Sequence, residues 1–264
     1  MYRLLVAAAL VGLVPGLSHA VEIKNVRPCF GPLGATRINT TCLPGDVLFM
    51  TYDIEDLKID AKTGKAKYDT TLELLDEKGK VIFEKKTPND VLPQLGGTRM
   101  PGDLHVIMPP KQPAGKYSVR LTVHDKLADN AKRFSFPFEV ESAGFGCVGV
   151  AAPGIALPGQ HHVTGFALVN LAVNAKKDPD VEVSYRILEN GKAVASTVKI
   201  FLPQQMPAGV NLAEANFVPL NFPVYLNRPG QYTVEVSATD KIAKKTREFR
   251  YKLTVLDVSS LVGR

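Results

Sequence analysis

The sequence predicts an all-β protein made of two copies of one sandwich unit, and three observations support this fold class. Residues 115–140 match residues 230–255 without a gap, at an offset of 230 − 115 = 115 residues. Within each copy, apolar and polar residues alternate with a period of two, as in a strand with one buried face. No amphipathic stretch of helical length interrupts these short alternating runs.

Residues 1–20 have the features of a secretory signal peptide. Arg3 gives a positive start, residues 4–13 are almost wholly apolar, and Pro15 precedes the small-x-small cleavage pattern Ser18-His19-Ala20. A membrane anchor is the alternative, but the apolar run is far shorter than the ~20 residues that span a bilayer. We therefore expect cleavage before Val21 and a mature protein that is secreted or periplasmic.

The length that remains corresponds to two domains. Removal of the signal peptide leaves 264 − 20 = 244 residues, against ~100–150 residues for a typical domain. We place the first sandwich at residues 21–141, the second at residues 142–257 and a C-terminal tail at residues 258–264. The boundary is a Ser-Ala-Gly sequence that follows a strand pattern and precedes Phe145-Gly146, the second copy of Phe30-Gly31.

Charge and composition narrow the classes of partner. The mature chain has a formal charge of (32 − 1) − 26 = +5, with acidic and basic residues interspersed. This charge allows weak attraction to an anionic polymer but does not resemble a nucleic-acid-binding stripe. No segment after the signal peptide is long and apolar enough to form a transmembrane helix. We expect an unknown protein or an anionic polymer as the partner, and no nucleic acid.

The repeat has the length of a whole domain. Its aligned pairs include Gly115 with Gly230, Tyr117 with Tyr232, Val119 with Val234, and Asp125 with Asp240. Upstream, Leu43-Pro44-Gly45 recurs as Leu157-Pro158-Gly159, and other short motifs recur at offsets between 110 and 115, which places insertions in loops. This period exceeds the ~20–50 residues of a solenoid unit and fits one duplicated domain.

Each copy contains about seven strand-like runs separated by clusters of Pro, Gly, Asn and Asp. In one such run, Leu48, Met50, Tyr52 and Ile54 alternate with Phe49, Thr51, Asp53 and Glu55. Asn190-Gly191 is a hairpin signal of the second copy. About seven short alternating strands in a domain of this size are typical of an immunoglobulin-like sandwich.

The segments Gly115–Asp125 and Gly230–Asp240 also carry a family resemblance. Each has a Gly-x-Tyr-x-Val strand that ends in Asp, and this resembles the penultimate strand of bacterial immunoglobulin-like modules, including those similar to polycystic-kidney-disease-type repeats. The resemblance spans both copies, roughly residues 26–257. The Trp-x-Phe-Gly-Asp-Gly motif of those repeats is missing, since the chain has no Trp. The resemblance therefore implies the fold class and nothing about ligands.

The chain has three cysteines, an odd number for an exported protein. Cys29 and Cys42 flank a short loop at the start of the first copy, and a disulfide between them would contribute ~3 kcal/mol in the chain-entropy model. We predict that bridge. Cys147 aligns with Pro32 and has no counterpart. It is either a small buried hydrophobe at the domain junction, an intermolecular disulfide or a redox-sensitive thiol.

Candidate catalytic and metal-binding residues are few. The mature histidines are His105, His124, His161 and His162. His161 and His162 are adjacent, so in a regular strand they point to opposite faces and do not share a metal. No Gly-x-Ser-x-Gly nucleophile motif is present. We therefore predict no enzyme activity, no metal and no cofactor.

Charged clusters have simple structural interpretations. Asp125 and Asp240 occupy equivalent places before a hairpin, where a side chain can cap the turn. The hairpins that follow are basic, with Lys126, Lys132 and Arg133 in the first copy and Lys241, Lys244, Lys245 and Arg247 in the second. Such residues protect a sheet edge, and contact with an acidic polymer is the alternative. Four acids of the first copy, Asp53, Glu55, Asp56 and Asp60, would suit calcium but are also ordinary for a solvent-facing strand.

The clearest difference between the copies predicts an interaction surface. Asp53 and Glu55 of the first copy align with Ala167 and Val169 of the second. A soluble module seldom leaves such an apolar strand bare, so it should meet the other domain, another subunit or a partner. A Pro-containing segment near residues 217–226 adds to it, because Pro219 and Pro223 confine that segment to an edge or loop. The predicted surface comprises Ala167, Val169, Leu171, Val173, Phe217, Leu220, Phe222 and Tyr225.

The sequence thus predicts an exported, non-enzymatic binding or structural module of the cell envelope or extracellular space, with a homo-oligomer possible. The alternative is a periplasmic chaperone-like protein, which would bind client subunits by adding a strand at an exposed sheet edge. Co-purification of a stable client would favour the alternative.

Overall fold

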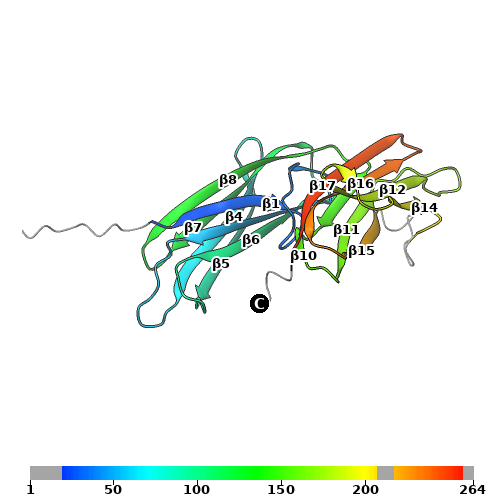
Figure 1. Cartoon of the computed structure of the whole chain (residues 1–264). Coiled ribbons are helices and arrows are strands. Elements are labelled where there is room, and N and C mark those ends of the chain that lie inside the picture. Colours follow the sequence, from blue (N-terminus) through cyan, green and yellow to red (C-terminus); the bar gives the residue numbers. More distant parts are fainter. Residues whose placement is uncertain (1–19, 207–216, 258–264) are drawn as a thin grey trace, which may run out of the picture.

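The computed structural model describes residues 20–206 and 217–257, and every regular element in these ranges is a β-strand (Figure 1). The strands form four sheets that pair into two sandwich bodies, which confirms the predicted fold class of two tandem immunoglobulin-like β-sandwiches. The predicted signal peptide, except for Ala20, and the predicted tail at residues 258–264 lie outside the described residues. Within the described ranges, no helix is long and apolar enough to cross a membrane.

The first body packs a three-stranded sheet of order β1-β3-β6 against a five-stranded sheet of order β2-β8-β7-β4-β5. Its strands are β1 (Glu22–Cys29), β2 (Thr41–Cys42), β3 (Val47–Glu55), β4 (Ala66–Leu75), β5 (Val81–Val91), β6 (Met100–Ile107), β7 (Gly115–Asp125) and β8 (Asn130–Val140). Leu48 and Met50 of β3 share the core with Val119 and Leu121 of β7. These are the apolar positions of the period-two pattern.

The second body pairs a sheet of order β15-β11-β9 with one of order β10-β17-β16-β12-β13, in which β14 also pairs with β12. Its strands are β9 (Gly146–Ala151), β10 (Ile155–Ala156), β11 (His161–Val169), β12 (Val181–Glu189), β13 (Lys192–Ala193), β14 (Val198–Leu202), β15 (Phe217–Tyr225), β16 (Gly230–Asp240) and β17 (Lys245–Val255). Phe166 and Leu168 of β11 share its core with Val234 and Val236 of β16.

The equivalent aspartates Asp125 and Asp240 cap the turns after their strands, as predicted. Asp125 Oδ1 accepts a hydrogen bond from Leu127 N–H at 2.9 Å, and Asp240 Oδ1 accepts one from Ala243 N–H at 2.8 Å. The second oxygen of each carboxylate accepts a backbone N–H from the loop that connects the two sheets of its body. Both carboxylates are therefore explained by the fold.

The two bodies lie end to end (Figure 1), and a loop of the first reaches into the core of the second. Phe30 directly follows β1 but is buried among residues of the second body, with its ring centroid 5.8 Å from that of Phe249 and 6.4 Å from that of Tyr251. Ala152 N–H donates to Phe30 O, and Ala35 N–H donates to Ala152 O. The domain boundary at residue 141 stays a prediction, because the core of the second body includes residues from the first copy.

The predicted disulfide between Cys29 and Cys42 is wrong, because both cysteines are free. Cys29 is paired with Phe49 in the β1–β3 ladder, on the face of that sheet that points away from the core. Cys42 lies in the core between the two sheets. The β1-β3-β6 sheet thus separates the two thiols, whereas a disulfide requires Cβ atoms that face each other at close range. Burial raises the pKa of Cys42 and of the free Cys147 to about 12, so both thiols stay protonated near neutral pH.

Candidate functional site

The outer face of the β15-β11-β9 sheet is the first candidate site. β11 and β15 pair in antiparallel register along their whole length, with His161 opposite Tyr225 and Val169 opposite Phe217. Their alternate residues, such as Leu168 and Leu220, point into the core. The outward residues form what we call the β11–β15 face: His161, Val163, Gly165, Ala167, Val169, Phe217, Pro219, Asn221, Pro223 and Tyr225.

The β11–β15 face contains no Asp, Glu, Lys or Arg. Phe217 and Tyr225, near its two ends, are 48% and 58% exposed. The same face of the first body is charged: Asp53 accepts a hydrogen bond from Arg99 at 2.7 Å, and Glu55 forms an ion pair with a lysine of β1. The first copy therefore carries charged side chains on this face, where the second carries none.

Four of the predicted surface residues lie on the β11–β15 face: Ala167, Val169, Phe217 and Tyr225. Leu220 and Phe222 do not, because they are buried in the core. Odd-numbered residues of β15 point outward and even-numbered residues point inward, so the four predicted residues of this strand do not share one surface. Beyond β11, Leu171 packs against the core and Val173 is exposed.

The first body closes the β9 side of this sheet. Val148 is paired with Ala167 in the ladder and is nonetheless buried. Its neighbour Gly149 donates its N–H to Asp46 Oδ1 of the first body at 2.9 Å. A Cβ added to Gly146 would lie 2.2 Å from a methyl carbon of Leu43, so this side chain packs directly on the glycine. Part of the uncharged sheet thus meets the other domain, and the β11–β15 face is the part left open.

A groove between the two bodies is the second candidate site. It has a volume of about 750 Å³ and lies between residues 37–43 of the first body and strands β12, β16 and β17 of the second. Its walls carry five basic residues, Arg37, Arg186, Lys199, Arg247 and Arg250, and five acidic residues, Asp46, Glu141, Glu182, Glu235 and Glu248. A volume of this size at a domain junction is typical of a small-ligand site.

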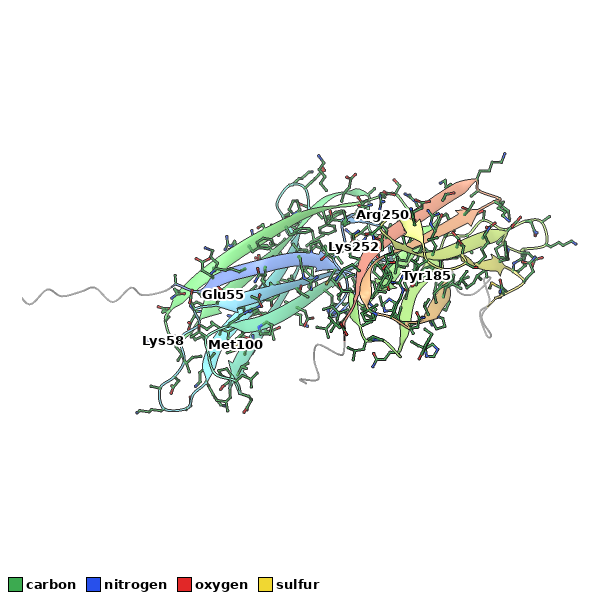
Figure 2. All side chains as sticks on the ribbon, viewed as in Figure 1. Glu55, Lys58, Met100, Tyr185, Arg250 and Lys252 are labelled. Carbon is green, nitrogen blue, oxygen red and sulfur yellow. The ribbon has the colours of Figure 1, made fainter. Side chains whose placement is uncertain are left out.

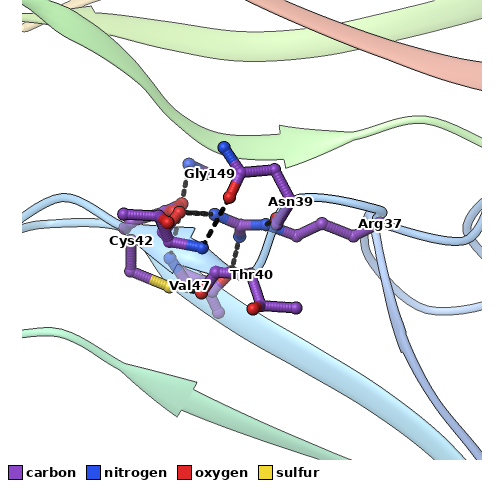
Figure 3. A network of polar contacts seen from close by, with 8 residues as sticks. Arg37, Asn39, Thr40, Cys42, Val47 and Gly149 are labelled. Atoms are coloured by element: carbon purple, nitrogen blue, oxygen red, sulfur yellow. Dashed lines mark hydrogen bonds and ion pairs between the residues drawn. The ribbon is translucent and has the colours of Figure 1, made fainter. Parts of the chain in front are cut away.

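A buried ion pair holds the first-body wall of the groove (Figure 3). Arg37 Nη2 lies 2.8 Å from Asp46 Oδ2, with both side chains less than a tenth exposed. The Arg37 guanidinium also donates to the backbone oxygens of Asn39, Thr41 and Val47. Asp46 Oδ1 receives the N–H of Gly149 from the second body. The Asp46 carboxylate therefore holds the loop that contains Arg37 and also links the first body to the second at Gly149.

The basic hairpins are largely committed to acidic partners. Lys126 Nζ lies 2.6 Å from Asp69 Oδ1, and Arg247 Nη2 lies 2.6 Å from Glu141 Oε2. Lys132 also has a glutamate partner. Pairs of this kind neutralise the charge that would attract an acidic polymer, and their contribution to stability at the surface is small.

A buried polar cluster in the second core was missed from the sequence. His162 Nε2 lies 2.9 Å from the hydroxyl of Tyr251, which also contacts the hydroxyl of Thr164. Comparison of the copies contains the signal, because His162 and Thr164 align with Leu48 and Met50 of the first core at the offset of Leu43-Pro44-Gly45. Two apolar core positions have thus become polar in the second copy. Burial lowers the pKa of His162 below its ordinary value of 6.5 and raises that of Tyr251.

The buried His162 predicts a pH-dependent stability of the second body. Because its pKa is lowered in the folded state, the unfolded chain binds the proton first as the pH falls below about 6.5. We expect the free energy of unfolding to fall from that pH down to the folded-state pKa and to level off below it. His162→Leu, which restores the residue of the first copy, should remove this component in urea titrations between pH 7 and pH 5. His161→Gln on the exposed face is the control, and an unchanged pH dependence in His162→Leu would contradict the prediction.

The described residues contain no group of three or more His, Cys, Asp or Glu placed to hold a metal ion. Of the four acids that would suit calcium, Asp60 is engaged in a turn, where its Oδ1 accepts the N–H groups of Lys62 and Thr63. The residues of the two candidate sites offer apolar contact, hydrogen bonds and ion pairs.

No family model and no curated protein matches this chain. Among solved structures, red sea bream transglutaminase matches with a TM-score of 0.31 and 10% sequence identity, over 90% of this chain and 31% of the transglutaminase chain. The chain thus spans about a third of the length of that protein. A likeness of this size says nothing about activity.

Proposed function

We propose that this chain is an exported, non-enzymatic binding module of the cell envelope or extracellular space, similar to bacterial immunoglobulin-like modules, that docks a protein partner on the β11–β15 face. The observation that carries the proposal is the absence of any charged side chain among the outward residues of two fully paired strands. Exposed apolar faces of this kind mark interaction sites in soluble proteins.

The size of the β11–β15 face favours a slender partner. Two strands of nine residues, at ~3.4 Å per residue and ~4.8 Å between strands, cover on the order of 300 Å². A stable dimer buries about 800 Å² on each partner. The face alone is thus too small for a pair of identical chains. It suits an extended segment of another protein, and its lack of charge disfavours an anionic polymer at this place.

Strand addition at a sheet edge, the chaperone-like alternative, has less support. β15 is an edge strand, but Pro219 and Pro223 remove two of its N–H donors. β5, another long edge strand, carries Pro88 and a pair of lysines, which are common protections against pairing. The start of β5, where Ile82 is 45% exposed, offers an apolar length of edge.

The test is affinity capture of a partner from the organism's own envelope fraction. Ala167→Asp with Val169→Glu gives the second copy the acids of the first and should reduce capture of the wild-type partner at least tenfold, because docking would then bury unpaired charges. Circular dichroism checks that the variant is folded.

Two further variants separate the explanations. Ala131→Glu with Ser135→Glu adds the same number of acids to exposed positions of β8 and should leave capture unchanged. Ile82→Pro lies at the irregularity of the β4–β5 ladder and blocks addition to that edge. Capture that survives the β11 acids, or that is lost only with Ile82→Pro, would overturn docking on the β11–β15 face, and the second result would establish strand addition.

A further inference from the structure

The interdomain groove has a separate chemical character from the β11–β15 face. Its lining includes outward residues of β12, β16 and β17, whereas the β11–β15 face lies on the opposite sheet of the second body. Its acids and bases balance at five each, and the hydroxyls of Thr41, Ser184, Thr197 and Ser237 lie among them. A wall that offers donors and acceptors in equal measure matches a ligand that offers both, such as a polyhydroxylated chain.

Most of the charges in the groove already have partners. Arg186 Nη2 lies 2.7 Å from Glu235 Oε2, and Lys199 Nζ lies 2.6 Å from Glu182 Oε1. Glu248 accepts a hydrogen bond from the hydroxyl of Ser237. Arg37 and Arg247 are likewise paired with Asp46 and Glu141. Such fixed pairs keep carboxylate lone pairs and guanidinium N–H groups at set positions, where they can bind the hydroxyl groups of a ligand.

Arg250 differs from the other bases of the groove. It points outward from β17 near the junction of the two bodies (Figure 2), and within residues 20–206 and 217–257 it has no hydrogen-bond or ion-pair partner. The acid directly across the ladder, Glu235, is held by Arg186. Within the described residues, Arg250 is thus the one base of the groove that is not paired with an acid, and its guanidinium presents a planar fork of donors suited to one carboxylate.

The first-body wall of the groove is held in place before any ligand arrives. The Arg37–Asp46 pair anchors it, and Gly149 ties it to the second body. Ile38, 74% exposed at the rim, adds an apolar surface. A preorganised wall loses little entropy when a ligand binds, which favours affinity for a chain laid along the groove.

We infer that the interdomain groove binds an acidic oligosaccharide, with Arg250 holding a carboxylate of the sugar chain and the paired charges and hydroxyls of β12, β16 and β17 contacting its hydroxyl groups. The site stands on the groove alone, so it does not depend on the protein partner of the β11–β15 face.

The experiment uses the full mature chain with oligogalacturonate, a chain of uronic acids, and its methyl ester, which has the same hydroxyls without the charge. Isothermal titration should give at least tenfold tighter binding of the acid form. Arg250→Gln should weaken that binding about tenfold, as expected for loss of one charge-assisted hydrogen bond. The matched control is Lys252→Gln, which removes the next outward charge on β17. The Nζ of Lys252 donates a hydrogen bond to Thr233 Oγ1 at 2.9 Å. This control should change affinity less than twofold.

Several outcomes would overturn the assignment. If the wild type does not bind oligogalacturonate, the groove is not the proposed site. If the ester binds equally well, the carboxylate has no role. Equal losses of affinity in Arg250→Gln and Lys252→Gln would indicate attraction to net charge alone. Equal affinity for polyglutamate would replace the sugar class with acidic peptides. The variant Ala167→Asp with Val169→Glu should bind oligogalacturonate normally, so failure of the groove and failure of the β11–β15 face are seen separately.

Discussion

Truncation of Phe30 to alanine is expected to destabilise the second body, although Phe30 belongs to the first copy. The ring is buried against Phe249 and Tyr251, and removal of a buried phenylalanine side chain typically costs about 3–5 kcal/mol. The free energy of unfolding, measured in urea by circular dichroism, should fall by that amount. Hydrogen exchange should become faster in β16 and β17 to a greater extent than in β4.

The control for Phe30→Ala is Leu33→Ala on the same loop. Leu33 is 88% exposed, so its truncation should change stability by less than about 0.5 kcal/mol. Faster exchange confined to the first body in Phe30→Ala would show that the ring does not serve the second core. The experiment also tests whether the boundary at residue 141 divides two folding units.

Substitution of Asp46 by alanine should have an effect of similar size. It leaves the Arg37 guanidinium buried without its carboxylate and removes the acceptor for Gly149 N–H. Removal of one partner from a buried ion pair typically costs about 3–5 kcal/mol. Urea unfolding measures the loss, and faster exchange of the Gly149 amide locates it at the junction.

A double replacement distinguishes the cost of leaving Arg37 without its counter-charge from the cost of losing the packing of the Asp46 side chain. Arg37→Met with Asp46→Leu removes both charges, and apolar replacement of a buried pair is often close to neutral. The double variant should therefore be more stable than Asp46→Ala. A loss below about 1 kcal/mol in Asp46→Ala, or a double variant that is less stable than it, would contradict the role assigned to this pair.

Local pattern explains why the fold class was predictable. The alternation in residues 115–125 and 230–240 places Val119 and Val234 in the two cores, because successive side chains of a strand point to opposite faces. The paired aspartates Asp125 and Asp240 cap their turns for an equally local reason, since each carboxylate reaches N–H groups two or three residues ahead.

The candidate surface was predictable in part. Comparison of the copies identified Ala167 and Val169, because a lost charge is visible in the sequence. The same alternation that predicted the strands would have excluded Leu220 and Phe222, which have the opposite parity to Phe217 and Tyr225 on β15. A Pro-containing strand alternates like any other, so only the odd-numbered residues of β15 reach this surface.

The sequence by itself determined the duplication, the strand periods and the loss of charge on β11, since each depends on neighbouring residues or on comparison of the copies. Only the tertiary structure decided that Cys29 and Cys42 lie on opposite sides of a sheet, that Phe30 enters the second core, and that Arg250 faces a groove with the Arg37–Asp46 wall. These features depend on contacts between residues far apart in the chain, on the register of the β1–β3 ladder, or on the relative position of the two bodies. Their physical cause is packing between elements, which no local pattern encodes.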